Sequence, residues 1–311
     1  MNPNEPREPG RPRDLPDYVV TRPHVPEPPR RSRFGYLLHI GVFIFIAVTC
    51  LIFLPPLMLP LGGYLVAGAL GTFAAAAIAN AIALRIYERG LLADVGLGWT
   101  DASRWNLGIG VAAGLGSAIF VVIVPVLLRK AEFTAAPGQP GRWRILLFVS
   151  AILLFGAIGE ELLFRGYAFQ ILVREIGAFA TILPFAILFA LAHLNNPNGN
   201  LFGIVNTFLW GVLLGWAFLR SGDLWLPIGL HFGWNWMLPL LGANLSGFNI
   251  SITGYTLHWM ASPLWSGAQY GPEGSVLTTL AVPALFFALR RAPIREQEAF
   301  LLRPHSGEQL S

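Results

Sequence analysis

The chain has 311 residues, of which 54% are hydrophobic and only 12% are charged. Soluble domains carry about 25% charged residues, so this composition excludes an ordinary soluble domain and indicates a polytopic membrane protein. The formal net charge of +4 does not indicate a nucleic-acid partner, because the basic residues are nearly all Arg in the tails and between apolar runs. Such residues set topology and contact lipid headgroups. The single cysteine, Cys50, excludes an intramolecular disulfide.

The order of polar and apolar runs predicts three regions. Residues 1–34 are rich in Pro and Arg and are predicted to be a disordered cytoplasmic tail. Residues 35–290 are predicted to form an all-α transmembrane domain, and residues 291–311 a cytoplasmic C-terminal tail. A membrane-spanning helix needs about 20 apolar residues. Eight apolar runs are predicted to span, at about 35–54, 62–86, 106–128, 144–170, 177–194, 201–219, 224–241 and 275–290.

The distribution of basic residues predicts the orientation of these helices. An even number of spans puts both termini on one side of the membrane. With the termini in the cytoplasm, 17 of the 21 Lys and Arg residues lie on the cytoplasmic side. This bias predicts an integral protein of the cytoplasmic membrane with both ends inside. Residues 242–274 then form a long external segment, which we interpret as an interfacial flap.

Three charged residues, Glu160, Glu161 and Arg165, interrupt the fourth apolar run. Charges at membrane depth are costly, and they usually pair with one another or face a polar cavity. Residues four apart share a helix face, so Glu161 can pair with Arg165 and leave Glu160 free to act as a general base. In the structural alternative, the glutamates mark a helix end and Arg165 extends to the headgroups.

Two further clusters follow in later apolar runs. Phe189 lies one turn before His193 and can pack against its imidazole. His231 and Asn235 share a helix face, where two N–H groups can donate to a single oxygen, as an oxyanion hole requires. The structural alternatives are a core or interfacial histidine for His193 and an interhelical hydrogen-bond clamp for His231 and Asn235.

Together these clusters resemble the three motifs of the CAAX prenyl protease and bacteriocin-processing (CPBP) family, also called the Abi family, over about residues 145–241. The resemblance implies an intramembrane endopeptidase with an eight-helix core and a cavity facing the cytoplasm. It also implies a membrane-associated protein or peptide as substrate, and membrane lipids as further partners. By position, Glu160 and His193 would activate water, His231 and Asn235 would hold the oxyanion, and Glu161, Arg165 and Phe189 would support them.

The use of a metal and the nature of the substrate stay open at this stage. Glu160, His193 and His231 form a possible zinc set, as in a metalloprotease. We favour a metal-free glutamate mechanism without a cofactor, because His-Glu-x-x-His is absent and Asn is an unusual zinc ligand. The substrate is either a CAAX-type C-terminus or a bacteriocin-like peptide. A non-catalytic immunity protein and a proton-coupled transporter are the rival functions.

The depth of Glu160 and His193 sets a geometric condition on the site. If their helices begin near residues 144 and 177 on opposite sides, the two groups lie about 14 Å apart in depth in a core of about 30 Å. We therefore expect the fourth helix to continue past Arg165 to about residue 172. We also expect Glu160, His193, His231 and Asn235 to converge in the cytoplasmic half.

Overall fold

The computed structural model describes residues 34–136 and 143–302. The predicted tail 1–34 lies outside this part except for Phe34, and the predicted tail 291–311 is described up to Leu302. The long helices are α1 (Gly35–Ala83), α2 (Asp101–Leu127), α3 (Trp143–Arg165), α4 (Tyr167–Ile176), α5 (Ala178–Ala192), α6 (Leu201–Ser221), α7 (Trp225–Leu240) and α9 (Val276–Arg291). The short elements are η1 (Leu84–Glu88), η2 (Leu92–Val95), β1 (Ala131–Ala135), β2 (Tyr255–Trp259), α8 (Pro263–Ser266), η3 (Ala268–Tyr270), η4 (Pro272–Gly274) and η5 (Phe300–Leu302).

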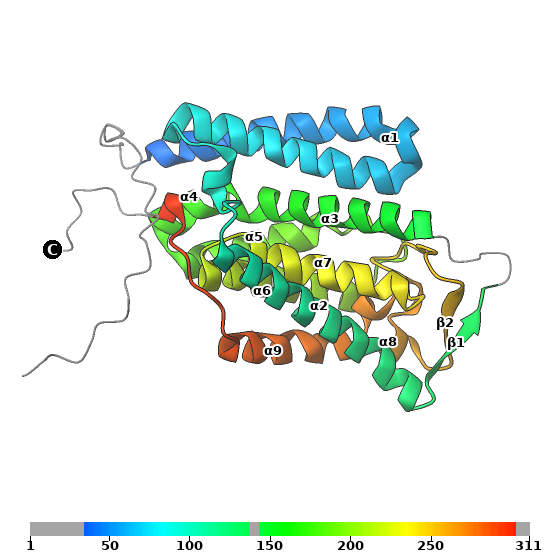
Figure 1. The fold of residues 1–311 in the computed structure, drawn as a ribbon. Coiled ribbons are helices and arrows are strands. Elements are labelled where there is room, and N and C mark those ends of the chain that lie inside the picture. Colours follow the sequence, from blue (N-terminus) through cyan, green and yellow to red (C-terminus); the bar gives the residue numbers. More distant parts are fainter. Residues whose placement is uncertain (1–33, 137–142, 303–311) are drawn as a thin grey trace, which may run out of the picture.

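Helix α1 folds back on itself at Gly62 and Gly63, whose backbone torsions are not helical. Gly63 has a φ of 73°, a conformation that glycine adopts readily. The two limbs run side by side in Figure 1. Gly71 lies directly against Pro55 of the other limb, since an added Cβ would be 2.6 Å from the Pro55 Cγ. The first two predicted apolar runs therefore form a helical hairpin.

By length and composition, four helical stretches of the described chain can cross a membrane, namely Gly35–Glu88, Asp101–Leu127, Trp143–Ile176 and Leu201–Ser221. This confirms a mostly helical membrane protein. The other predicted runs also form helices, but α5, α7 and α9 have only 15, 16 and 16 residues. The total of eight spans therefore stays a prediction.

The helical run continues past Arg165 as expected and reaches Ile176, but it is interrupted at Gly166, where α3 ends and α4 begins. Asn80 of α1 fills the break: its Nδ2 donates to the Leu162 carbonyl at 2.9 Å, and its Oδ1 accepts from the Tyr167 N–H at 2.7 Å. A Cβ on Gly166 would overlap both the Leu162 carbonyl and the Asn80 side chain. A side chain from a distant part of the sequence thus replaces the missing helical hydrogen bonds.

The turn at Gly177 removes the predicted difference in depth between Glu160 and His193. Helix α4 extends past Arg165 before the chain reverses at Gly177, which has a φ of 90°. Glu160 lies 17 residues before this turn and His193 lies 16 residues after it. Because α4 packs against α5, the two residues reach the same level of the bundle.

The bundle has two ends that differ in content (Figure 1). We call the end that holds α4, the loop 222–224 and residues 292–302 the tail face. The opposite end, with β1, β2 and residues 242–274, is the strand face. Strands β1 and β2 pair antiparallel, from Ala131 opposite Trp259 to Ala135 opposite Tyr255. Segment 242–274, expected to be an interfacial flap, packs closely on this end, where Tyr270 is buried.

At the tail face, the described part of the C-terminal segment is held against the bundle. The Gln297 N–H donates to the Ser221 carbonyl at 2.7 Å. Asp223 accepts from Asn106 Nδ2 at 2.9 Å and from the side chain of Gln297. Burial raises the pKa of Asp223 above its ordinary value, and these donors oppose the rise. Residues 292–302 therefore close the tail face.

Helices α2 and α7 approach through glycines on both sides. A Cβ on Gly114 would overlap the Leu230 carbonyl and lie 2.7 Å from Trp234 N. A Cβ on Gly229 would lie 2.5 Å from the Leu107 carbonyl. Small residues allow such close backbone contact between apolar helices. This packing fixes the position of α7, which carries His231.

Replacement of Gly114 by Ala should destabilise the protein by about 1–3 kcal/mol, because the methyl group overpacks this contact. Gly116→Ala is the matched control, since a Cβ there meets no atom within 4 Å. Thermal unfolding of the two purified variants in one detergent is the measurement. Equal melting temperatures would contradict the role of Gly114.

Candidate active site

Glu161 and Arg165 form a fully buried ion pair inside the bundle. Arg165 Nη1 lies 3.2 Å from Glu161 Oε1, and the two side chains are 1% and 0% exposed. Arg165 Nη2 also donates to the Gly211 carbonyl of α6 at 3.0 Å. Its guanidinium lies over the Phe189 ring of α5, 4.7 Å from the centroid. The spacing of four residues thus produces the expected pair, which joins α3 to α5 and α6.

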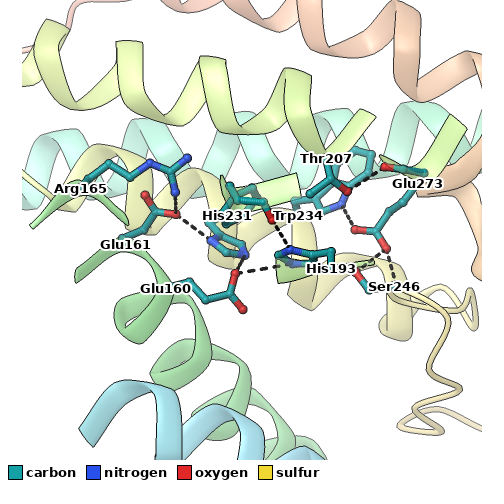
Figure 2. Close-up of polar contacts among 11 residues, drawn as sticks. Glu160, Glu161, Arg165, His193, Thr207, His231, Trp234, Ser246 and Glu273 are labelled. Atoms are coloured by element: carbon teal, nitrogen blue, oxygen red, sulfur yellow. Dashed lines mark hydrogen bonds and ion pairs between the residues drawn. The ribbon is translucent and has the colours of Figure 1, made fainter. Parts of the chain in front are cut away.

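His231 of α7 continues this chain of contacts (Figure 2). Its Nδ1 lies 2.9 Å from Glu161 Oε1, and its Nε2 lies 3.8 Å from Glu160 Oε2. A carboxylate only accepts, so Nδ1 carries the proton of this hydrogen bond. In the neutral ring Nε2 then has a lone pair, and it becomes a donor only in the imidazolium form.

His193 is oriented by Phe189 in two ways. Its Nδ1 lies 2.8 Å from the Phe189 carbonyl, so Nδ1 donates and Nε2 is left with a lone pair. The two rings also pack at a centroid distance of 4.7 Å. His193 Nε2 lies 3.8 Å from Glu160 Oε2. The sequence indicates the ring contact, but the contribution of the Phe189 carbonyl requires the structure.

Glu160 lies between the two imidazoles, as Figure 2 shows. Its Oε2 is buried and has no hydrogen-bond partner among the described residues. Its side chain is 28% exposed overall, whereas that of Glu161 is fully buried. Glu160 Oε2 lies 3.8 Å from each Nε2 atom, and this distance is too long for a direct hydrogen bond. This arrangement is suited to holding a water molecule or a proton.

A cavity of about 460 Å³ connects these groups with the fourth predicted site residue, Asn235. Asn235 lies one helical turn after His231 and lines the same cavity. The structure thus brings Glu160, His193, His231 and Asn235 to one space. Its walls also include Thr72, Gly156, Phe164, Thr207, Trp210, Trp234, Leu245, Ser246, Phe248 and Glu273.

Glu273 is a cavity residue that the sequence analysis did not select. The Trp234 indole donates to its Oε1 at 3.0 Å, and the backbone N–H and the hydroxyl of Ser246 donate to Oε2. Burial raises the pKa of Glu273, and the hydrogen bonds from these donors oppose the rise. Glu273 is the only Asp, Glu, Lys or Arg residue in segment 242–274. This single charge is the signal in the sequence that could have identified it.

A zinc ion does not fit these atoms without rearrangement. Ligands of tetrahedral zinc lie about 3.3 Å from one another, given bonds of about 2.0–2.1 Å. The Oε2 atom of Glu160 lies 3.8 Å from each imidazole Nε2. Among the described residues, no group of three or more His, Cys, Asp or Glu side chains has an arrangement that could hold a metal.

The described helices thus enclose a cavity that Glu160, His193, His231 and Asn235 line together. Residues 142–237 match the family described as type II CAAX prenyl endopeptidase Rce1-like. This match supports the family assignment that the three motifs indicate, the CAAX prenyl protease and bacteriocin-processing family, over the part of the chain that carries those motifs.

One relative with a curated description is an "Uncharacterized 24.3 kDa protein" of Escherichia coli. It is 28% identical over 148 residues, which cover 46% of this chain and 62% of that protein. The match thus spans less than two thirds of the relative. No solved structure matches the chain.

Replacement of Glu273 by Gln should loosen loop 244–250, because an amide cannot accept all three donors and places its own N–H₂ against one of them. Loss of this contact should speed hydrogen exchange at the Ser246 amide about tenfold. Glu132→Gln, on exposed β1, is the control. Unchanged exchange in the Glu273 variant would show that the carboxylate does not fix the loop.

Proposed function

We propose that the chain is an intramembrane endopeptidase that hydrolyses a peptide bond of a membrane-associated protein or peptide, with lipids as its other partners. The observation that carries this proposal is the position of Glu160 Oε2, 3.8 Å from Nε2 of both His193 and His231 in a cavity. The family match supports a CAAX-type intramembrane protease in general.

In this proposal Glu160 and His193 activate the hydrolytic water. Phe189 directs the Nε2 lone pair of His193 toward Glu160, so a water between them meets two acceptors. Glu160 takes a proton from this water, and the oxygen adds to the substrate carbonyl carbon. Glu160 then gives the proton to the leaving amine as the carbon–nitrogen bond breaks. No proton is gained or lost by the enzyme over the cycle.

His231 and Asn235 hold the oxyanion that forms on the substrate carbonyl. Because Nδ1 of His231 donates to Glu161, its Nε2 can donate only if the ring is an imidazolium. Arg165 and Glu161 balance each other, so a charged His231 would balance Glu160. Pairing of this kind lowers the cost of buried charge. The Asn235 amide would supply the second donor.

The proposed mechanism uses no metal. The alternative places zinc between Glu160, His193 and His231, where it would activate the same water. We expect full activity after dialysis against a strong chelator. Metal analysis of the dialysed protein then checks that no zinc is bound to the sample whose activity is measured. Loss of activity that returns with added zinc would eliminate the metal-free mechanism.

Replacement of Glu160 by Gln should lower proteolysis by at least about a hundredfold, because the amide cannot accept a proton. Expression and melting temperature should be unchanged, since the buried ion pair is left intact. Comparative proteomics of membranes from wild-type and variant cells would detect a C-terminus or leader that is retained in the variant. Glu132→Gln is the control for a lost surface carboxylate.

The same variant separates the rival functions. An immunity protein that acts by binding alone would keep its protection after Glu160→Gln. A proton-coupled transporter would instead show substrate flux in proteoliposomes that this variant abolishes. Identical membrane peptides in wild-type and variant cells would contradict the protease function.

A further inference from the structure

The backbone around Glu273 is held firmly against helix α6. Asn206 of α6 donates from Nδ2 to the Glu273 carbonyl at 2.7 Å and to the Ser275 carbonyl at 2.9 Å. The Ser275 hydroxyl in turn donates to the Pro272 carbonyl at 2.6 Å. These hydrogen bonds do not involve the Glu273 side chain. The structure therefore fixes the point from which the carboxylate of Glu273 extends.

One oxygen of this carboxylate holds a tight turn in the cavity wall. Leu245 and Phe248 exchange backbone hydrogen bonds at 2.9 and 2.8 Å, and the two residues between them have positive φ, 49° at Ser246 and 83° at Gly247. This is the pattern of a type I′ turn, in which a residue other than glycine is strained. Glu273 Oε2 offsets the strain, because it accepts from both the backbone N–H and the hydroxyl of Ser246.

The other oxygen holds the part of α7 that carries two site residues (Figure 2). Glu273 Oε1 accepts from the Trp234 indole at 3.0 Å. Trp234 lies three residues after His231 and directly before Asn235, and its ring also packs on Trp210 at a centroid distance of 4.9 Å. All three residues of α7 lie within about one helical turn. A rotation of α7 that broke the indole contact would therefore move His231 and Asn235 as well.

The ionised form of Glu273 suits these contacts. Its two oxygens accept three hydrogen bonds, and a carboxylate only accepts. Withdrawing this charge from water costs free energy, so an apolar side chain would join the same elements at lower cost. The carboxylate adds direction, because it holds each donor at a defined distance, as a preorganised site requires. Glu273 lines the cavity together with His193 and Asn235, so this direction is given to the candidate site itself.

We propose that Glu273 is a positioning residue of the reaction, which acts through Trp234 on the turn of α7 that presents His231 and Asn235 to the substrate carbonyl. Through Ser246 it also fixes the adjoining wall of the cavity. Glu273 takes no proton in this role and acts only on the placement of the two oxyanion donors. The inference rests on the proposed function for the reaction, whereas the placement of α7 is testable without cleavage.

Nuclear magnetic resonance of the full chain in detergent micelles tests this placement. The side-chain amides of asparagine are labelled with nitrogen-15, and the Asn235 signals are identified by their loss in an Asn235→Ala variant. We expect Glu273→Ala and Glu273→Leu, which both remove the accepting oxygens but differ in volume, to shift or broaden these signals beyond their linewidth. Asn244→Ala is the matched control, because it removes a hydrogen bond between the same loop and Gln269 but no contact of Glu273.

Unchanged Asn235 signals in either Glu273 variant would overturn the proposal, as would an equal change in the Asn244→Ala control. A double-mutant cycle then tests the role in the reaction, as the rate at which folded protein forms the Glu160-dependent product found by membrane proteomics. We expect Glu273→Ala to lower this rate about tenfold in the wild-type background, because the oxyanion donors are misplaced. In a Trp234→Phe background the same change should cost less than about threefold, since the indole donor is already absent.

The two measurements separate this proposal from the proposed function. Equal losses in both backgrounds would overturn action through Trp234, because the packing lost in Trp234→Phe cancels in the cycle. A Glu160-dependent product that the Glu273→Ala variant forms at the wild-type rate would overturn the positioning role and leave the protease function intact. Absence of any such product would contradict the protease function, and the Asn235 signals would still decide whether Glu273 places α7.

Discussion

The buried ion pair between Glu161 and Arg165 constrains the rest of the structure. Removing two charges from water costs several kcal/mol for each ion, and this cost is offset only when good partners surround them. Here the partners come from several helices: the Gly211 carbonyl of α6, the Phe189 ring of α5 and the His231 imidazole of α7. The contacts that offset the cost of burying these charges therefore also hold together the helices that carry the candidate active site.

The break at Gly166 and the turn at Gly177 connect this packing to the geometry of the site. Asn80 pairs with two backbone groups at the break, the Leu162 carbonyl and the Tyr167 N–H, and so lowers the cost of the bend. The extra length of α4 then sets the register in which α5 returns, and this register places His193 beside Glu160. A shift by one residue would rotate His193 by about 100° around α5 and direct it away from the cavity.

Local spacing is the part of this site that the sequence predicts well. The Glu161–Arg165 pair and the packing of Phe189 on His193 follow from residues four apart on a helix. Contacts between distant residues are not predictable in this way. Asn80 at the helix break and the hydrogen bonds of Ser246 and Trp234 to Glu273 join segments far apart in the chain. Apolar length likewise predicts helices, but it does not show that α1 is a hairpin or which residues line the cavity.

The buried charges also limit how water can reach the cavity. An opening at the tail face would bring water to Glu161 and Arg165, and in water an ion pair contributes about 1 kcal/mol or less. Such an opening would weaken the contact that positions His231. Glu160, in contrast, needs water and is the more exposed of the two carboxylates. Adjacent residues on one helix therefore have opposite requirements: Glu161 is shielded by its partners, whereas Glu160 lines the cavity.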